Sequence, residues 1–570
     1  MESNWSMCFR RSLRTAFQHV GIVAMLGSFL IAQQSSPSPF VRTSTLLRPA
    51  RHGEPYLALP EFQNGRRLAG EIDVGHGFSD RDAVAPDTAA FPLLSMDALA
   101  SILQEVGSVD ASKLHALQGG EHLLVREEDA AVVARVCREL GAAMPPEVRC
   151  DFEIVVRTRD NERVLMRREV LARSGQLAWG SAVEDSVAVT DFEVEISQEA
   201  TAGNPVVQRV LHGAMVAVRP LVPTGEARGF FDVLLRIVDR GDEGLVELGE
   251  TTSGSFDRVH QRVRELGVVL SARVGETVTH RFSGLDGSAI ELRMTPRWAV
   301  APATASVGGR DFEYAPRWLD CRGYRSLELD AVQVAELSAF EPDRLSFSES
   351  LERSRVAFWN AGPSEAVVAV GDAAVQLRLF QQARHAELSP VVVRVVAYDA
   401  AVGQEPAADG TMAAANRLAS AEVATLFGSW VAATSYEEFS IVADWDVEVA
   451  QGARIGDPKV RRRAVGAALN LRCTDAGVEI EGELSTRGPI ESRRMRIGQG
   501  KFATTNAKTS DAPSYVVPPE VVTIESVRRS RQPLQIRLPL RRDQPAVFRA
   551  TTPFLPQGRE LVVTAQRLDG

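Results

Sequence analysis

The sequence predicts a β-rich α+β fold in which one unit, a small α/β module followed by a β-domain, occurs twice in tandem. Three observations support this prediction. A 29-residue stretch recurs later in the chain, helix-like periodicity precedes the β-rich part, and period-two alternation of apolar residues dominates the rest. With 570 residues, 45% of them hydrophobic and 24% charged, the chain is long enough for several domains with real cores.

The internal repeat is the strongest of these observations. Residues 191–219 align without gaps with residues 444–472, and 12 of the 29 positions are identical, against about two expected from ordinary residue frequencies. Similarity at this level indicates a structural repeat. The repeat-motif residues are Asp191, Val194, Glu195, Gln198, Pro205, Gly213 and Arg219 in the first copy and Asp444, Val447, Glu448, Gln451, Pro458, Gly466 and Arg472 in the second.

Weaker matches extend the repeat upstream and set the expected domain order. Residues 123–135 resemble 367–378, and residues 93–99 resemble 326–332. We therefore expect a leader at 1–32, an irregular segment at 33–89, an α/β module at 90–145 and a β-domain at 150–300, followed by a second α/β module at 320–385 and a second β-domain at 390–570.

The first module should contain two helices around a short strand. Apolar residues recur three and four positions apart along 96–106, which predicts a helix with one buried stripe. A strand at 122–126 follows, and Asp129 is a suitable N-cap for a helix that ends near Leu140.

The β-domains should begin with strands at 152–160 and 391–399. In the repeat motif Trp445, Val447 and Val449 alternate with acidic residues, which predicts a half-buried strand with its acidic face outward. The sequences Gly-Asn-Pro at 203–205 and Gly-Asp-Pro at 456–458 predict loops. Second strands are expected at 215–219 and 468–472.

The N-terminus and the charge balance bear on location and partners. Arg10, Arg11 and Arg14 precede an apolar run over 20–32, which predicts a secretory signal peptide and an exported protein. An uncleaved anchor is the alternative. The net charge of −10 argues against a nucleic-acid partner. The cysteines Cys137, Cys150, Cys321 and Cys473 show no metal spacing and are expected to be buried thiols, with a disulfide as the alternative.

We expect no catalytic, cofactor or metal site. The chain lacks a nucleophile elbow, a zinc-protease helix motif, a phosphate-binding loop and a dinucleotide fingerprint. Asp444 and Asp446 share one strand face, but a solvated face explains them better than a metal pair. The segment 73–82, with one histidine and three aspartates, is interpreted as a polar linker, and the basic run 459–463 as a solvated loop. The histidines expected to be structural or superficial are His122, His212, His260, His280 and His385.

The order of elements and the motif resemble a known family. The pattern D-x-[DE]-V-E-[VI]-x-Q, a proline turn, and G-A-x-[VL]-x-[VL]-R, together with "GAMVAVRPLV" at 213–222 and "VGETV" at 274–278, resemble the secretin-type β-domain and its ring-building modules. Secretins are bacterial outer-membrane proteins of secretion and pilus systems. Each carries one β-domain per chain, whereas this sequence indicates two.

The resemblance implies a non-enzymatic envelope protein, periplasmic or associated with the outer membrane. Its expected partners are copies of itself or other secretion proteins. No pair of amphipathic hairpins that would cross a bilayer is evident, so a soluble or peripherally attached relative is expected rather than a channel. The alternatives are an exported monomeric scaffold and a hydrolase without a recognisable motif.

Overall fold

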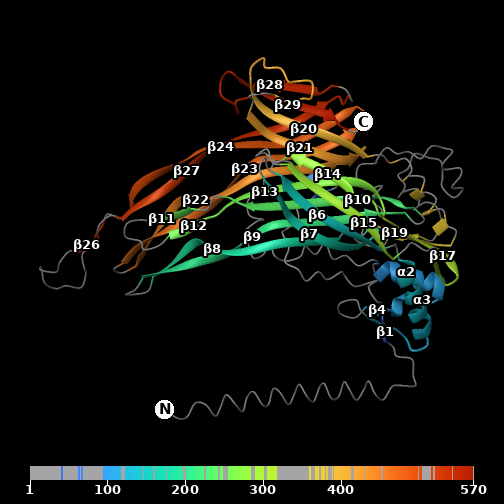
Figure 1. The fold of residues 1–570 in the computed structure, drawn as a ribbon. Coiled ribbons are helices and arrows are strands. Elements are labelled where there is room, and N and C mark those ends of the chain that lie inside the picture. Colours follow the sequence, from blue (N-terminus) through green and yellow to red (C-terminus); the bar gives the residue numbers. More distant parts are fainter. Residues whose placement is uncertain are drawn as a thin grey trace, which may run out of the picture.

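The computed structural model describes residues 94–316 and 358–568, with short gaps, and the segments 40–42, 62–63 and 66–67. Its helical elements are α2 (Met96–Gly107), the 3-10 turn η3 (Ala111–Lys113) and α3 (Ala130–Ala143). Described residues between Ala374 and His385 are also helical, and the remaining regular structure in these residues is antiparallel sheet (Figure 1). The β-rich α+β class predicted from the sequence is therefore confirmed.

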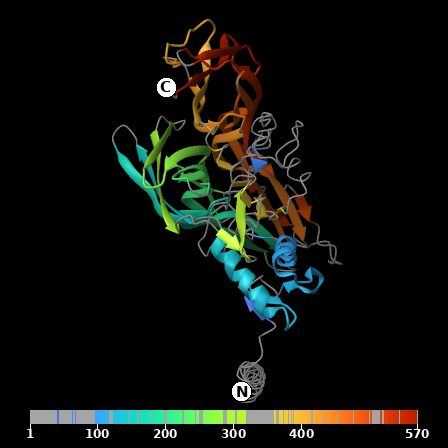
Figure 2. The same ribbon diagram turned by 90° about the vertical axis from the view of Figure 1, so that its right-hand side faces the viewer.

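One long sheet of eight strands organises the molecule. Its strands, in spatial order, are β27 (Glu520–Leu538), β24 (Gly477–Ile497), β23 (Ala453–Thr474), β22 (Trp430–Ala450), β13 (His260–Arg273), β10 (Arg228–Arg240), β9 (Thr201–Leu221) and β8 (Ala178–Ile196). The first four come from the second half of the chain and the last four from the first half. Figure 2 shows these halves, coloured orange to red and cyan to green, as neighbouring blocks.

Two four-stranded sheets accompany the long sheet. The first has the order β14 (Val278–Ser283), β15 (Ala289–Val300), β6 (Glu147–Arg157) and β7 (Glu162–Arg173). The second has the order β28 (Ala546–Ala550), β29 (Arg559–Arg567), β20 (Pro390–Ala401) and β21 (Asn416–Leu426). Taken in chain order, both halves run through the same eight strand positions with the same pairing. We call each half's four strands of the long sheet, with its small sheet, a unit.

A single apolar core joins the long sheet to both small sheets. Along β6 every second residue is buried, at Val148, Cys150, Phe152 and Ile154. These side chains belong to one cluster that also contains residues of β9, β13, β20, β23 and β29. Period-two burial of this kind is what a strand with one face on a core requires. The core thus runs through both units without interruption.

The α/β module has a second core. The buried side of α2 is formed by Ala98, Leu99, Ile102 and Leu103, largely the predicted stripe. They pack with α3 and with a four-stranded sheet of β16 (Ala305–Val307), β17 (Arg310–Pro316), β19 (Ala366–Val370) and β18 (Phe358–Asn360). Asp129 is the N-cap residue of α3, as predicted, although its side chain makes no capping hydrogen bond.

Short strands complete the described structure. The strand β5 (His122–Leu124) pairs with β4 (His115–Ala116) and with β1 (Phe40–Arg42), so part of the segment 33–89 joins the module. The separate hairpins are β2 (Phe62–Gln63) with β3 (Arg66–Arg67), β11 (Gly244–Glu247) with β12 (Ser255–Arg258), and β25 (Gly500–Phe502) with β26 (Tyr515–Val517).

The predicted loops at 203–205 and 456–458 are wrong. Pro205 lies within β9 opposite Phe192, and Pro458 lies within β23 opposite Trp445. Both prolines fit a strand because β10 pairs with β9 only from residue 213 onward, and β24 pairs with β23 only from residue 467 onward. At each proline the strand therefore has one ladder partner, and the missing N–H can face the unpaired side.

Candidate assembly interface

The junction between the two units is the most informative feature of the long sheet. The last long strand of unit one, β13, pairs with the first long strand of unit two, β22, from His260 opposite Phe439 to Leu266 opposite Ala433. We call this pairing the seam. It joins two equivalent units edge to edge through ordinary antiparallel strand pairing, so one sheet continues through both.

The seam also brings the two small sheets together. His280 on β14 of unit one donates a hydrogen bond from Nε2 to the backbone oxygen of Glu422 on β21 of unit two, at 2.8 Å. Burial lowers the pKa of His280, while the hydrogen bond to Glu422 opposes that shift. The ring is therefore held neutral, as a donor between the units.

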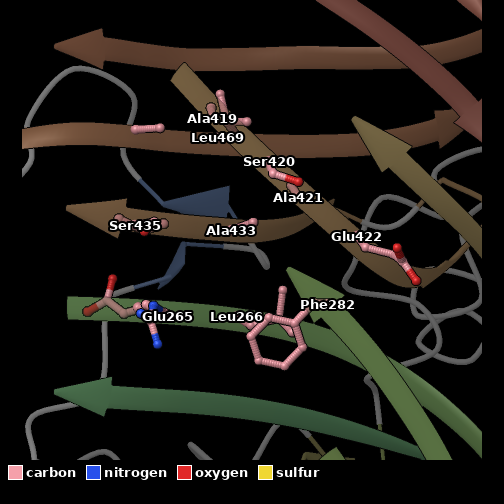
Figure 3. Close-up of a pocket in the computed structure, with 13 residues that line it drawn as sticks. Glu265, Leu266, Phe282, Ala419, Ser420, Ala421, Glu422, Ala433, Ser435 and Leu469 are labelled. Carbon is pink, nitrogen blue, oxygen red and sulfur yellow. The ribbon is translucent and has the colours of Figure 1, made fainter. Parts of the chain in front are cut away.

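A small cleft lies where β21 crosses the seam. Figure 3 shows β21, with Ala419 to Glu422, running obliquely over β13, β22 and β23. Its water-sized space is ≈30 Å³, which is room for about two water molecules. The lining is mostly apolar, with Leu266, Phe282 and Leu469 among its members. The cleft is too small for an organic substrate.

Charged side chains also meet across the seam. Glu437 of β22 receives Arg262 Nε and His260 Nε2 of β13, each at 3.8 Å. The contact with His260, followed by the nearby Arg487 and Arg262, lowers the pKa of Glu437 against the effect of burial. Within unit one, Arg236 Nε and Glu265 Oε1, at 3.6 Å, form an almost fully buried ion pair between β10 and β13. Breaking such a pair is costly once both charges are desolvated.

The repeat motif lies mostly away from the seam, in the two long hairpins β8–β9 and β22–β23. Asp191, Val194 and Glu195 lie in β8, and Asp444, Val447 and Glu448 in β22. A register shift precedes Asp191 and Asp444 at the same place in both hairpins. Gln198 and Gln451 lie outside the described residues.

The backbone geometry requires glycine at two positions of the motif. Gly213 has a φ of +129° and Gly466 a φ of +151°. A Cβ at Gly213 would lie 2.1 Å from the Ala182 carbonyl oxygen, and one at Gly466 would lie 2.2 Å from the Ser435 carbonyl oxygen. Only glycine fits such a backbone.

The last motif residues, Arg219 and Arg472, face acidic positions on the next strand. Arg219 lies opposite Asp232, and Arg472 lies opposite Glu479. Arg472 Nε donates to Glu479 Oε2 at 2.7 Å.

The predicted outward face of the motif strand is only partly described. Trp445 is 7% exposed, and its Nε1 donates to the Thr523 carbonyl at 2.9 Å, while Asp444 is exposed. These two orientations agree with the prediction. The side chains of residues 446–449 lie outside the described part.

The remaining predictions concern the basic run, the cysteines and the polar segment. The basic run 459–463 lies in β23 rather than in a loop, which corrects that prediction. Cys137, Cys150 and Cys473 are buried free thiols, and burial raises the pKa of Cys137 to about 12. Cys321 and the segment 73–82 lie outside the described residues. Among the described residues no cluster could hold a metal ion, and no helix is long and apolar enough to span a membrane.

Sequence reasoning missed the seam. A signal was available, because the acidic doublet Glu184–Asp185 recurs as Glu437–Glu438 at the spacing of the motif, 253 positions. Glu437 and Glu438 lie on the seam, where Glu438 is fully buried opposite Gln261. Read alone, each doublet is typical of a solvated strand.

No model of a known protein family matches the chain, and no curated protein matches it. Among solved structures the chain is similar to the InvG secretin domain β-barrel from the Salmonella SPI-1 injectisome NC-base. The sequence identity is 11%, the match covers 34% of this chain and 74% of that chain, and the TM-score is 0.20. At these values the likeness concerns a secretin-like fold at most.

Proposed function

We propose that the protein is a non-enzymatic, exported structural component of a bacterial envelope assembly, and that it assembles by adding its sheet units edge to edge. The observation that carries this proposal is the seam. Within one chain, β22 of unit two pairs with β13 of unit one, so one unit already extends the sheet of the other.

The ends of the long sheet are suited to repeating that contact. The outermost strands are β8, the counterpart of β22, and β27, the counterpart of β13. A second chain could therefore place its β8 against β27 of the first. Because this contact joins two different surfaces, it is heterologous, and it produces a ring when the rotation between units closes.

The seam also supports a structural role over a catalytic one. Glu437 and His280 make polar contacts across the seam, and its cleft admits about two water molecules. Long unpaired sheet edges are an aggregation hazard unless they have a partner or a cover. Location in the periplasm or at the outer membrane is part of the proposal and is supported by the Arg-flanked apolar run near the N-terminus.

The monomeric scaffold remains the competing function, and one observation favours it. The start of β27 folds back over unit two, where Glu525 accepts a hydrogen bond from the Val442 backbone at 3.1 Å and pairs with Arg258. Part of this edge strand is therefore already occupied within the chain.

Mass photometry of the chain lacking residues 1–32 distinguishes the two functions. The measurement is made over a range of concentrations, with and without mild detergent. We expect species at whole multiples of the chain mass, growing with concentration. A single species at the chain mass under every condition, with no self-crosslinks in cells, would leave only the scaffold.

A further inference from the structure

The long sheet itself sets the register in which a second copy would bind. One row of register partners crosses all eight strands. It runs through Gly180, Val216, Leu235, Leu266, Ala433, Leu469, Gly482 and Leu534. The first four belong to unit one and the last four to unit two, in the same strand order. The seam is the step from Leu266 to Ala433, so the same step from Leu534 leads to Gly180 of a following chain.

Antiparallel pairing then fixes every other position. Residues 528–534 of β27 take the places of 260–266 of β13, and residues 180–186 of β8 take the places of 433–439 of β22. In this register Arg528 lies opposite Ser186, Arg529 opposite Asp185 and Ser530 opposite Glu184.

The β27 edge is basic, and Glu483 lies near both Arg529 and Arg531. Arg528 and Arg531 are exposed. Arg529 lies 3.7 Å from Glu483, and its buried Nε and Nη2 atoms find no hydrogen-bond partner among the described residues. Arg487 stands directly opposite Arg529 on β24, an unfavourable like-charge position. Burial, and then the neighbouring Arg531, lower the pKa of Arg529.

The β8 edge carries the opposite charge at the matching positions. Glu184 is exposed and is the counterpart of Glu437. In the seam Glu437 lies 3.8 Å from His260 Nε2, its diagonal neighbour across the strands. The counterpart of His260 is Arg528. The chain-to-chain contact would thus replace the His260–Glu437 pair with an arginine–carboxylate pair, which is charged at every physiological pH.

Two further features bear on this register. Pro533 would lie opposite Ser181, and a proline has no N–H to donate. The Ser181 carbonyl accepts Arg168 Nε of its own chain at 2.6 Å, so the Arg168 side chain would have to move aside for this pairing. Next to the charged positions, Val187 is 69% exposed on β8. Its seam counterpart, Ser440, is 3% exposed.

We propose that a second copy of this chain binds with residues 180–186 of its β8 antiparallel to residues 528–534 of β27, with Glu184 meeting the arginines of the β27 edge. This proposal rests on the proposed function and adds the partner surface, the register and the charge pairing. Exposed charge pairs of this kind mainly speed and direct association, and they weaken as salt is added.

Cysteine crosslinking tests the register. In the full chain without its leader, Gln532→Cys with Ala182→Cys places two thiols on residues that lie opposite each other between chains. The register control is Gln532→Cys with Ser186→Cys, and the reference for crosslinking across a seam is Arg262→Cys with Glu437→Cys within one chain. Mild oxidation should produce ladders of linked chains from the first variant only.

The outcomes separate this proposal from the proposed function. Multimers by mass photometry without ladders, or ladders from the Ser186→Cys control, would overturn the register while leaving assembly intact. A chain that forms no multimers would overturn both.

Charge reversal tests the pairing independently. Glu184→Arg alone and Arg528→Glu alone should each weaken association by about tenfold or more, and mixing the two variants should restore association through alternating unlike chains, because both contacts between unlike chains then pair opposite charges. Both positions are exposed, so thermal melts should match the parent. Equal association by all variants and at all salt concentrations would overturn the charge pairing.

Discussion

Replacing Gly466 by alanine should destabilise the β22–β23 hairpin strongly. The residue has a φ of +151°, and its Cβ would lie 2.2 Å from the Ser435 oxygen and 2.5 Å from the Tyr436 Cα. Both atoms are backbone of the paired strand, so the clash cannot be relieved by turning a side chain. The left-handed conformation costs roughly 1–2 kcal/mol and overpacking about 1–3 kcal/mol. We expect a loss of about 2–5 kcal/mol in the stability of this sheet.

Two other glycines provide matched controls. Gly275 has a φ of +98°, and a Cβ at this position would have no atom within 4 Å; Gly141 lies in α3 with equally open space. Gly275→Ala should therefore cost only the conformational term, and Gly141→Ala should stabilise by about 1 kcal/mol through helix propensity. The assay is the urea midpoint followed by tryptophan fluorescence. If Gly466→Ala were no worse than Gly275→Ala, the close strand approach would be wrong.

Two more predictions concern packing and pH. Trp445→Ala should lower the free energy of unfolding by about 3–5 kcal/mol, because it leaves a cavity and an unpaired Thr523 carbonyl. Asp444→Ala changes an exposed position and should lower it by less than about 1 kcal/mol. Thermal melts measure both, and the reverse order would contradict the inward orientation of the indole. Burial lowers the pKa of His280 and of His385 in the folded chain. As the pH drops below about 6.5, the unfolded chain therefore binds protons on these histidines before the folded chain does, and the stability should fall. His280→Gln, which keeps a donor, should make the dependence between pH 7 and pH 5 shallower, and an unchanged slope would mean that His280 is not held neutral at the seam.

The local elements were predictable because their signals are local. The three- and four-residue periodicity of α2 and the alternation along β6, β20 and β22 depend on residues near one another in the chain. The loops predicted at Pro205 and Pro458 were wrong because proline usually occurs in loops. Here the strand lacks a second partner at each proline, a fact that depends on where β10 and β24 begin to pair.

The assembly interface could not be predicted in the same way. Its position depends on which strand ends each unit and which begins the next, so β13 and β22 meet across more than 150 residues of sequence. The duplicated glycines at 213 and 466 were found as matches, but the reason for them is the neighbouring strand's carbonyl. The acidic doublets can be assigned to an interface only from the structure, in which the second doublet lies at the seam.

Hydrogen exchange on separated monomeric and assembled fractions tests most directly whether the seam is repeated between chains. Amides of residues 260–266 and 433–439 should exchange slowly in both fractions, because the seam lies within the chain. Within 180–186 and 528–534, alternate amides already donate to β9 or β24, so the outward-facing amides of these segments should be fast in the monomer and become as slow as the seam in the assembly. If these edge amides stayed fast in the assembled fraction, the sheet would not continue from chain to chain and the account would be contradicted.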